Sequence, residues 1–301
     1  MILTLRSLAD QFFACITVTN APGTVAYYRR HVERFLEHVG EIPISELKPP
    51  ALIAWGRSWH QVQAVQRLFN WAVNEAGLLE QSPFRRVKRP RLGRRKRTLQ
   101  RGQVVELLRR AGPRFRAYLL ALRETIARPQ EIRALTWEDL HAVDGQGDAI
   151  AALAQGGAFF VLHKHKAQAL AADPDRPRIL LISPRLGRLL ARLASVRCSA
   201  QGPIFLRDDG AAWTNNAVRL RMRRLRRRCG LHPDARGENI VCYTFRHTGA
   251  TRATSLGVRD RQLAELMGHT TTRMTARYQH LETAHLREAF DKLNPDRRKS
   301  Q

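Results

Sequence analysis

Four short segments of the 301-residue chain concentrate side chains that could do chemistry: residues 125–131, 163–166, 243–247 and 266–280. In the first, Pro129 suits the first position of a helix, so that Arg128 stands where the chain enters it. Glu131 follows one turn later, near the positive end of the helix dipole, and can anchor the guanidinium group of Arg128. A plain surface arginine at a helix start is the alternative.

The second segment reads His-Lys-His-Lys and holds Lys164 and Lys166, the two lysines of the chain's central part. Its two histidines, His163 and His165, could share one face of a strand and bind a metal ion. No carboxylate or cysteine ligand set accompanies them, so we predict no metal site.

In the fourth segment, His269 and Tyr278 lie nine residues apart, which places them on opposite faces of any single helix. They can meet only if the chain turns between them. Gly268 can end one helix, and Thr272 can cap the next. Core packing is a poor explanation for a tyrosine held beside a histidine and several arginines, one of them Arg246 in the third segment.

These segments need helices and a small sheet to position them. Residues 1–84 have apolar side chains at helical spacing, with stops at Gly40 and Gly77, and predict a small helical bundle. Further helices are expected at 103–110, at 115–125 and from 185 onward. Residues 158–162 and 178–182 have strand-like patterns on either side of a loop, which predicts a hairpin.

The composition limits the classes of molecule that the protein can be expected to bind. Lys+Arg number 52 against 26 Asp+Glu, a formal charge of +26, and 45 of the basic residues are arginine. A folded protein keeps such a charge when a polyanion offsets it, so nucleic acid is the first candidate and an anionic membrane surface the second. The four cysteines form no C-x-x-C pair, and no apolar run approaches the roughly 18 residues of a membrane span. We therefore expect a reduced, soluble, cytoplasmic protein associated with the nucleoid.

Two basic stretches are candidates for contact with a phosphate backbone. Residues 85–101 contain ten basic residues, no acidic one and several helix breakers, which indicates an interdomain linker. We favour a linker that lies across the DNA backbone, and the alternative is a solvated tether without DNA contacts. Residues 219–228 contain seven arginines around a thin apolar seam and predict a helix with a cationic face. The expected contacts are Arg94, Arg95, Lys96, Arg97, Arg221, Arg224 and Arg228.

The order and spacing of the motifs Arg128–Glu131, Arg246-His247, Gly268-His269 and Tyr278 resemble the catalytic signature of the tyrosine recombinase (phage integrase) family, over residues 102–285. The resemblance implies a mainly α fold with a small antiparallel β-sheet. It implies a helical core-binding (SAM-like) DNA-binding domain over 1–84, a basic linker over 85–101, a catalytic domain over 102–284 and a C-terminal helix and tail over 285–301.

The resemblance also assigns roles residue by residue. Tyr278 matches the nucleophile that attacks a DNA phosphodiester and forms a 3′-phosphotyrosyl link. Arg128 and Arg246 match the pair that clamps the non-bridging oxygens, with His269 in support and Glu131 as the carboxylate behind the arginines. Two arginines and a lysine then supply the positive charge, so that no metal or other cofactor is implied.

Lys166 best matches the hairpin lysine that protonates the leaving 5′ oxygen, and Lys164 is the alternative. The chain departs from the family pattern at two positions. Tyr243 stands where the family often has histidine, and a neutral phenol is a poor base at pH 7. Ile126 stands where glycine is common, in the turn into Arg128.

The sequence thus predicts an enzyme, a tyrosine-type site-specific recombinase or integrase of a mobile element or chromosomal system. Its partner would be double-stranded DNA, bound by a homotetramer on two DNA sites. The C-terminal segment from 285 would pack either in cis or on a neighbouring subunit. The alternatives are a type IB topoisomerase that relaxes DNA and a catalytically decayed DNA-binding protein.

Overall fold

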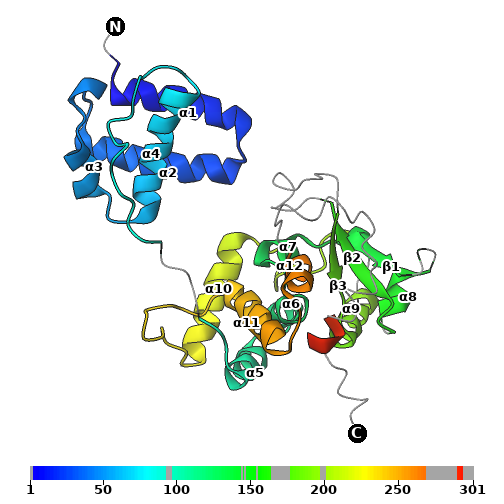
Figure 1. The fold of residues 1–301 in the computed structure, drawn as a ribbon. Coiled ribbons are helices and arrows are strands. Elements are labelled where there is room, and N and C mark those ends of the chain that lie inside the picture. The colour runs from blue at the N-terminus through cyan, green and yellow to red at the C-terminus, as the bar shows by residue number, and fades with distance from the viewer. Residues whose placement is uncertain are drawn as a thin grey trace. The chain divides into compact units, whose positions relative to one another are not determined.

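The structure is a computed structural model, which describes residues 3–92, 97–143, 145, 147–153, 155–163, 177–196, 201–268 and 290–293. The chain divides into two compact units, Met1–Arg94 and Arg95–Gln301. The described residues are mainly helical, and three strands form one small antiparallel sheet in the second unit (Figure 1). The predicted fold class is confirmed.

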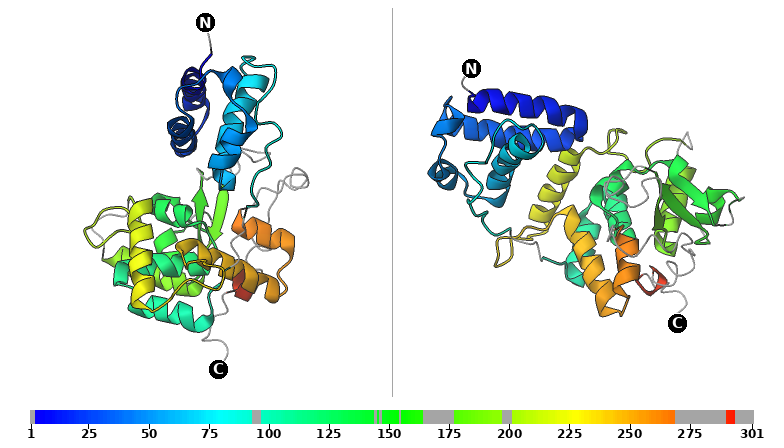
Figure 2. Two further views of the ribbon diagram at one scale, coloured as in Figure 1. Left: turned by 90° about the vertical axis from the view of Figure 1, so that its left-hand side faces the viewer. Right: turned by 45° about the horizontal axis from the view of Figure 1, so that its top comes forward.

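The first unit is the predicted helical bundle. Its helices are α1 (Leu5–Thr19), α2 (Pro22–Val39), the 3-10 turn Ile44–Glu46, α3 (Pro49–Trp55) and α4 (Trp59–Asn74). Proline opens α2 and α3, and Gly40 ends α2 with a φ of 76°. Helices α1 and α2 lie side by side (Figure 2) and pack with α4 around a core that includes the fully buried Phe12, Phe35 and Phe69.

The basic stretch after this bundle begins packed on the first unit. Phe84 and Val87 are buried in its core. The buried side-chain amide of Gln66 on α4 donates hydrogen bonds to the carbonyl oxygens of Phe84 (3.1 Å) and Val87 (2.8 Å), and accepts one from Arg89 Nε (2.7 Å). Residues up to Arg89 are therefore fixed to the bundle.

The second unit contains the sheet and the remaining helices. Its elements are α5 (Arg101–Arg110), α6 (Pro113–Thr125), α7 (Pro129–Ala134), the 3-10 turn Trp137–Asp139, β1 (Leu140–Ala142), α8 (Ala149–Leu153), β2 (Ala158–Leu162), β3 (Arg178–Leu181), α9 (Pro184–Ser195), α10 (Asn215–Arg228), α11 (Cys242–Ser255) and α12 (Asp260–Met267).

The predicted hairpin is present as β2 and β3, which pair antiparallel with Phe160 opposite Leu180. The sequence reading missed β1, which pairs with the other edge of β2. Three residues are too few to show an alternating pattern. Helices α5 and α6 each begin two residues before the predicted starts, at Arg101 and at the helix-opening Pro113.

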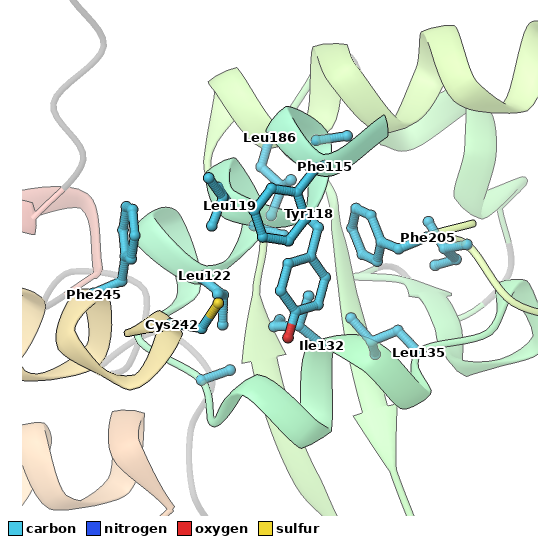
Figure 3. Packing of buried hydrophobic residues seen from close by; sticks show 14 of the residues in the cluster. Phe115, Tyr118, Leu119, Leu122, Ile132, Leu135, Leu186, Phe205, Cys242 and Phe245 are labelled. Atoms are coloured by element: carbon cyan, nitrogen blue, oxygen red, sulfur yellow. The ribbon is translucent and has the colours of Figure 1, made fainter. Parts of the chain in front are cut away.

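Helix α6 lies at the centre of the second unit and packs against α5, α7, α9 and α11. Its Tyr118 is fully buried among apolar side chains and points its hydroxyl toward α7 (Figure 3). That hydroxyl donates to the carbonyl oxygen of Pro129 (2.7 Å), the first residue of α7. Burial raises the pKa of the Tyr118 phenol, which keeps it neutral and able to donate. The core thus fixes the turn that carries Arg128.

The C-terminal residues 290–293 are helical and pack in cis. Phe290 and Leu293 are buried in a small apolar cluster with Ile126, Leu181 and Leu266. None of the described helices combines the length and the apolar character needed to cross a membrane.

Replacing Gln66 by alanine should destabilise the first unit and release the chain after Phe84. The change removes two buried hydrogen bonds and one partly buried hydrogen bond, and leaving buried polar groups unsatisfied costs about 1–3 kcal/mol. Urea unfolding of the full chain checks the stability. Limited trypsin digestion checks the release, because cleavage after Arg85 and Arg86 should accelerate. Gln11→Ala, at an exposed position of α1, is the control; equal digestion of both variants would contradict the role of Gln66.

Candidate active site

Three arginines and one glutamate from three parts of the chain meet in the second unit: α7 with the residue before it, β3 and α11. Arg128 is the residue before α7, Glu131 lies in α7, Arg178 begins β3, and Arg246 lies on α11. Three of the four are almost fully buried, and the side chain of Arg128 is 15% exposed. Buried charges of this number are unusual and need specific partners.

Glu131 holds the turn at the start of α7 as the sequence predicts. Its carboxylate accepts from the backbone N–H of Arg128 (2.7 Å) and from Arg128 Nη1 (2.7 Å). The first bond satisfies one of the orphan donors at the helix start, and the second is a buried ion pair. Arg128 is therefore held by its own helix.

Arg178 was not among the predicted site residues. Its Nε lies 3.2 Å from Glu131 Oε1, as an ion pair in which both side chains are less than 5% exposed. Its Nη1 and Nη2 donate to the carbonyl oxygens of Glu265 (3.2 Å) and Leu266 (2.9 Å) at the end of α12. An arginine at the start of an otherwise apolar strand, on the same face as the buried Leu180, was the available signal.

Arg246 is completely buried and joins two chain turns. Its Nη1 donates to the carbonyl oxygen of Ile126 (2.8 Å), and its Nη2 donates to that of Met267 (2.7 Å). The position of this guanidinium group is thereby fixed relative to both Arg128, which follows Ile126, and the end of α12.

The C-terminal end of α12 receives all three arginines. Arg178 binds the carbonyls of Glu265 and Leu266, Arg246 binds that of Met267, and Arg128 Nη2 binds that of Gly268 (2.9 Å). The last carbonyls of a helix lack intrahelical donors and carry the negative end of its dipole, so they are suited to cations.

Gly268 is required at this helix end for two reasons. Its φ of 62° lies in the left-handed region, as predicted from its place after α12. A Cβ atom on it would lie 2.4 Å from Nη1 of Arg178. The guanidinium group of Arg178 thus packs directly on the glycine that precedes His269.

Among the described residues of this cluster, three arginines lie around one carboxylate, and the pKa values reflect the imbalance. Burial, together with repulsion from Arg128 and Arg178, lowers the pKa of Arg246 to about 10. Burial lowers the pKa of Arg178 too, against the attraction of Glu131. Burial alone would raise the pKa of Glu131, but Arg178 and Arg128 outweigh it, so the pKa lies below the ordinary value. With three arginines around one carboxylate, positive charge is in excess among the described residues of the cluster.

Tyr243 lies one turn before Arg246 on α11 and is 39% exposed. Its ring meets that of His247 edge to face, with 4.9 Å between the ring centroids. Tyr243 is therefore at the exposed rim of the arginine cluster, and its catalytic role stays a prediction.

The other predicted catalytic residues, Lys166, His269 and Tyr278, lie outside the described residues, as does the alternative Lys164. The structure brings Arg128, Glu131 and Arg246 together.

The predicted DNA contacts divide into three groups. Arg94, Arg95 and Lys96 lie outside the described residues. Arg97 is tied to Glu238, whose carboxylate accepts from the Arg97 backbone N–H (2.8 Å) and whose carbonyl accepts from its guanidinium group.

On α10, the three predicted arginines differ in their contacts. Arg221 pairs with Asp208 (2.8 Å), so an acidic partner reaches this helix that the sequence reading did not foresee. Arg228 and Arg224 are both exposed, and Arg228 donates to the carbonyl oxygen of Arg110 (3.0 Å). The contacts of these residues with DNA stay predictions.

Glu131→Gln should destabilise the protein at neutral pH by about 3–5 kcal/mol, because it leaves buried cations without their carboxylate. A carboxylate with a lowered folded-state pKa stabilises the fold above its unfolded pKa, and that stabilisation is lost as pH falls through the folded pKa. The difference in unfolding free energy between the variant and the wild type should therefore narrow progressively as the pH falls below about 4, as denaturant unfolding can measure. Glu106→Gln is the control, since Glu106 also pairs with two arginines, Arg109 and Arg110, but at the surface. A difference in unfolding free energy between Glu131→Gln and wild type that does not change with pH would contradict the ion-pair explanation.

Curated relatives match parts of the chain. Tyrosine recombinase XerC of Oceanobacillus iheyensis is 33% identical over 96 residues, which are 31% of this chain and 28% of the relative. Tyrosine recombinase XerC of Pelobacter propionicus is 26% identical over 189 residues, 62% of this chain and 54% of the relative. The chain thus matches about half or less of these relatives' length.

Solved structures share the fold over nearly the whole chain. The crystal structure of a lambda integrase dimer bound to a COC′ core site has a TM-score of 0.69 at 14% identity, and the match covers 93% of this chain and 78% of that one. A lambda integrase tetramer bound to a Holliday junction has a TM-score of 0.68 at 13% identity, covering 94% and 81%. The sequence model of the phage integrase family matches residues 97–285, which contain the whole arginine cluster, and the chain therefore belongs to that family.

Proposed function

We propose that the protein is a site-specific recombinase that cleaves and rejoins DNA strands. The observation that carries this proposal is the buried excess of positive charge that Arg128, Arg178 and Arg246 form around Glu131, whose carboxylate is the one that the described residues bring to the cluster. A buried cluster of this kind is stabilised by an anionic group, and a phosphodiester has the matching charge and oxygen geometry.

Arg128 and Arg246 would bind the non-bridging oxygens of the scissile phosphate. Each terminal nitrogen of a guanidinium group carries two hydrogens, so Arg128 can hold Glu131, Gly268 and a phosphate oxygen at the same time. The negative charge on these oxygens is held in the transition state by groups already fixed in place, and catalysis by preorganised charge works in this way.

The covalent step would be a transesterification. The phenol oxygen of Tyr278 loses its proton to water and attacks phosphorus, forming the 3′-phosphotyrosyl bond, while the bond from phosphorus to the 5′ oxygen breaks. Lys166 gives a proton to that 5′ oxygen, and His269 supports the phosphate. One phosphate ester replaces another, so the bond energy is kept for rejoining. Tyr243, a weak base, would donate a hydrogen bond at the rim of the site.

The proposed partner is double-stranded DNA. The lambda integrase structures of the same fold hold a core site in a dimer and a Holliday junction in a tetramer, which supports a homotetramer on two DNA sites here. Residues 1–84 would be the core-binding domain, 102–284 the catalytic domain, and the basic residues of 85–101 and of α10 the backbone contacts. Such a protein would act in the cytoplasm, at the nucleoid.

A nicked suicide substrate should trap the protein on DNA through a 3′ link, because the short 5′-hydroxyl fragment diffuses away before rejoining. Tyr278→Phe should form no detectable adduct. Tyr243→Phe should still form it, at a reduced rate. Denaturing gels and mass spectrometry of the labelled peptide check both, and an adduct with Tyr278→Phe would refute the nucleophile. Strand transfer between two labelled duplexes, compared with relaxation of supercoils, separates a recombinase from a topoisomerase.

Lys166→Ala should slow cleavage of ordinary DNA by about 10²–10⁴-fold, the usual contribution of a general acid. It should barely affect a substrate with a 5′-thiolate leaving group, which needs no proton. Single-turnover cleavage of both substrates measures this, and Lys164→Ala is the matched variant. If Lys164→Ala shows the thiolate rescue instead, the general acid is Lys164.

A further inference from the structure

Arg178 adds its charge to the buried cluster, but the proposed chemistry assigns it no contact with the scissile phosphate. Its side chain is 4% exposed, and its printed contacts in the described residues are with Glu131 and with the end of α12. We propose that Arg178 is a positioning residue, which sets the phosphate clamp by fixing Glu131 and the end of α12 relative to each other. The inference rests on the proposed function, since it concerns the same clamp.

One guanidinium group joins three elements that are far apart in the sequence. Arg178 belongs to β3, its Nε pairs with Glu131 of α7, and its two terminal nitrogens bind Glu265 and Leu266 of α12. Glu131 in turn holds Arg128, and the same end of α12 holds Arg128 and Arg246 through Gly268 and Met267. A shift of Arg178 would therefore displace both groups that hold Arg128, namely Glu131 and the end of α12.

The geometry requires arginine at this position. Both terminal nitrogens of its planar fork donate hydrogen bonds to two consecutive carbonyls, while its Nε faces one carboxylate as an ion pair. A lysine could pair with Glu131 but could not reach all three acceptors. Gly268 lets the fork lie flat against the chain, since any Cβ there would overlap Nη1, Cζ and Nε at 2.4–2.8 Å.

Arg178 also determines how Glu131 is shared. In the present arrangement Oε1 of Glu131 faces both Arg178 Nε (3.2 Å) and Arg128 Nη1 (2.7 Å), while Oε2 accepts from the Arg128 backbone. Without Arg178, two carbonyls of α12 lose their charged donors and one side of the carboxylate is left without its cation. Arg128 would then be drawn toward the carboxylate of Glu131 and toward the carbonyls of α12. Its guanidinium group would turn away from the position in which it can bind the phosphate.

The test compares two DNA substrates. One has an ordinary scissile phosphodiester, and the other has a neutral methylphosphonate at the same position, where a charge clamp has less to stabilise. Adduct formation is measured as a single-turnover rate at saturating protein, for the full chain, with thermal unfolding measured in parallel. Arg178→Met removes the charge, Arg178→Lys keeps it without the fork, and Arg192→Met is the control at an exposed position of α9.

Arg178→Met should lose about 100-fold in rate on the phosphodiester, the loss that a misplacement near 1 Å can cause. Its loss on the methylphosphonate, relative to wild type, should be at least tenfold smaller. Arg178→Lys should fold as wild type does. Its rate on the phosphodiester should lie between those of wild type and Arg178→Met, because the lysine neutralises Glu131 but leaves the carbonyls unbound. Arg192→Met should match wild type on both substrates.

Two results would overturn the inference alone: equal losses on both substrates for Arg178→Met and Arg178→Lys, or wild-type rates for Arg178→Lys on the phosphodiester. If Arg178→Met does not fold, the Arg178→Lys ratio decides. If wild type forms no adduct with either substrate, the proposed function fails, and this inference fails with it. The two failures are therefore distinguishable.

Discussion

The arginine cluster depends on the hydrogen bonds that its guanidinium groups make to the C-terminal end of α12. Four successive carbonyls, from Glu265 to Gly268, accept hydrogen bonds from three guanidinium groups. Hydrogen bonds that involve a charged group contribute about 1.5–3 kcal/mol each, more than bonds between neutral groups. Together with Glu131, these carbonyls offset the repulsion and the loss of hydration that three buried cations suffer. Without that helix end, the cluster would be a collection of mutually repelling charges.

Because each arginine comes from a different element, the cluster exists only when all of them are docked. Arg128 needs α7 to begin at Pro129, which Tyr118 of the core fixes through its hydrogen bond. Arg178 needs the pairing of β3 with β2, and Arg246 needs α11 against α6. The site is therefore a property of the folded second unit as a whole. A preformed clamp has little reorganisation to undergo when a phosphate arrives, which favours catalysis by electrostatic preorganisation.

The sequence predicted those parts of the site that depend on local geometry. Pro129 and the spacing to Glu131 were enough for the Arg128 turn, and Gly268 marked the end of α12. Arg178 was missed because a charged residue at the first position of a strand usually faces the solvent. Its burial follows from an acceptor on α7 and two on α12, and no local pattern shows that these come together. The three-residue β1 was missed because its pairing with β2 is also a long-range property.

Ile126 shows how long-range packing can replace a local preference. It has a φ of 55°, in the left-handed region, which costs a residue with a side chain about 1–2 kcal/mol. Its side chain is 2% exposed, and burying an isoleucine contributes about 1.5–3 kcal/mol. Room for it comes from Gly249 on α11, where a Cβ atom would approach Ile126 Cγ1 to 3.0 Å. The two contributions are similar in size, so the turn forms at little net cost. The packed side chain of Ile126 fixes the backbone at this position, which would be more mobile with glycine. The Ile126 carbonyl oxygen that accepts from Arg246 is thereby held in place.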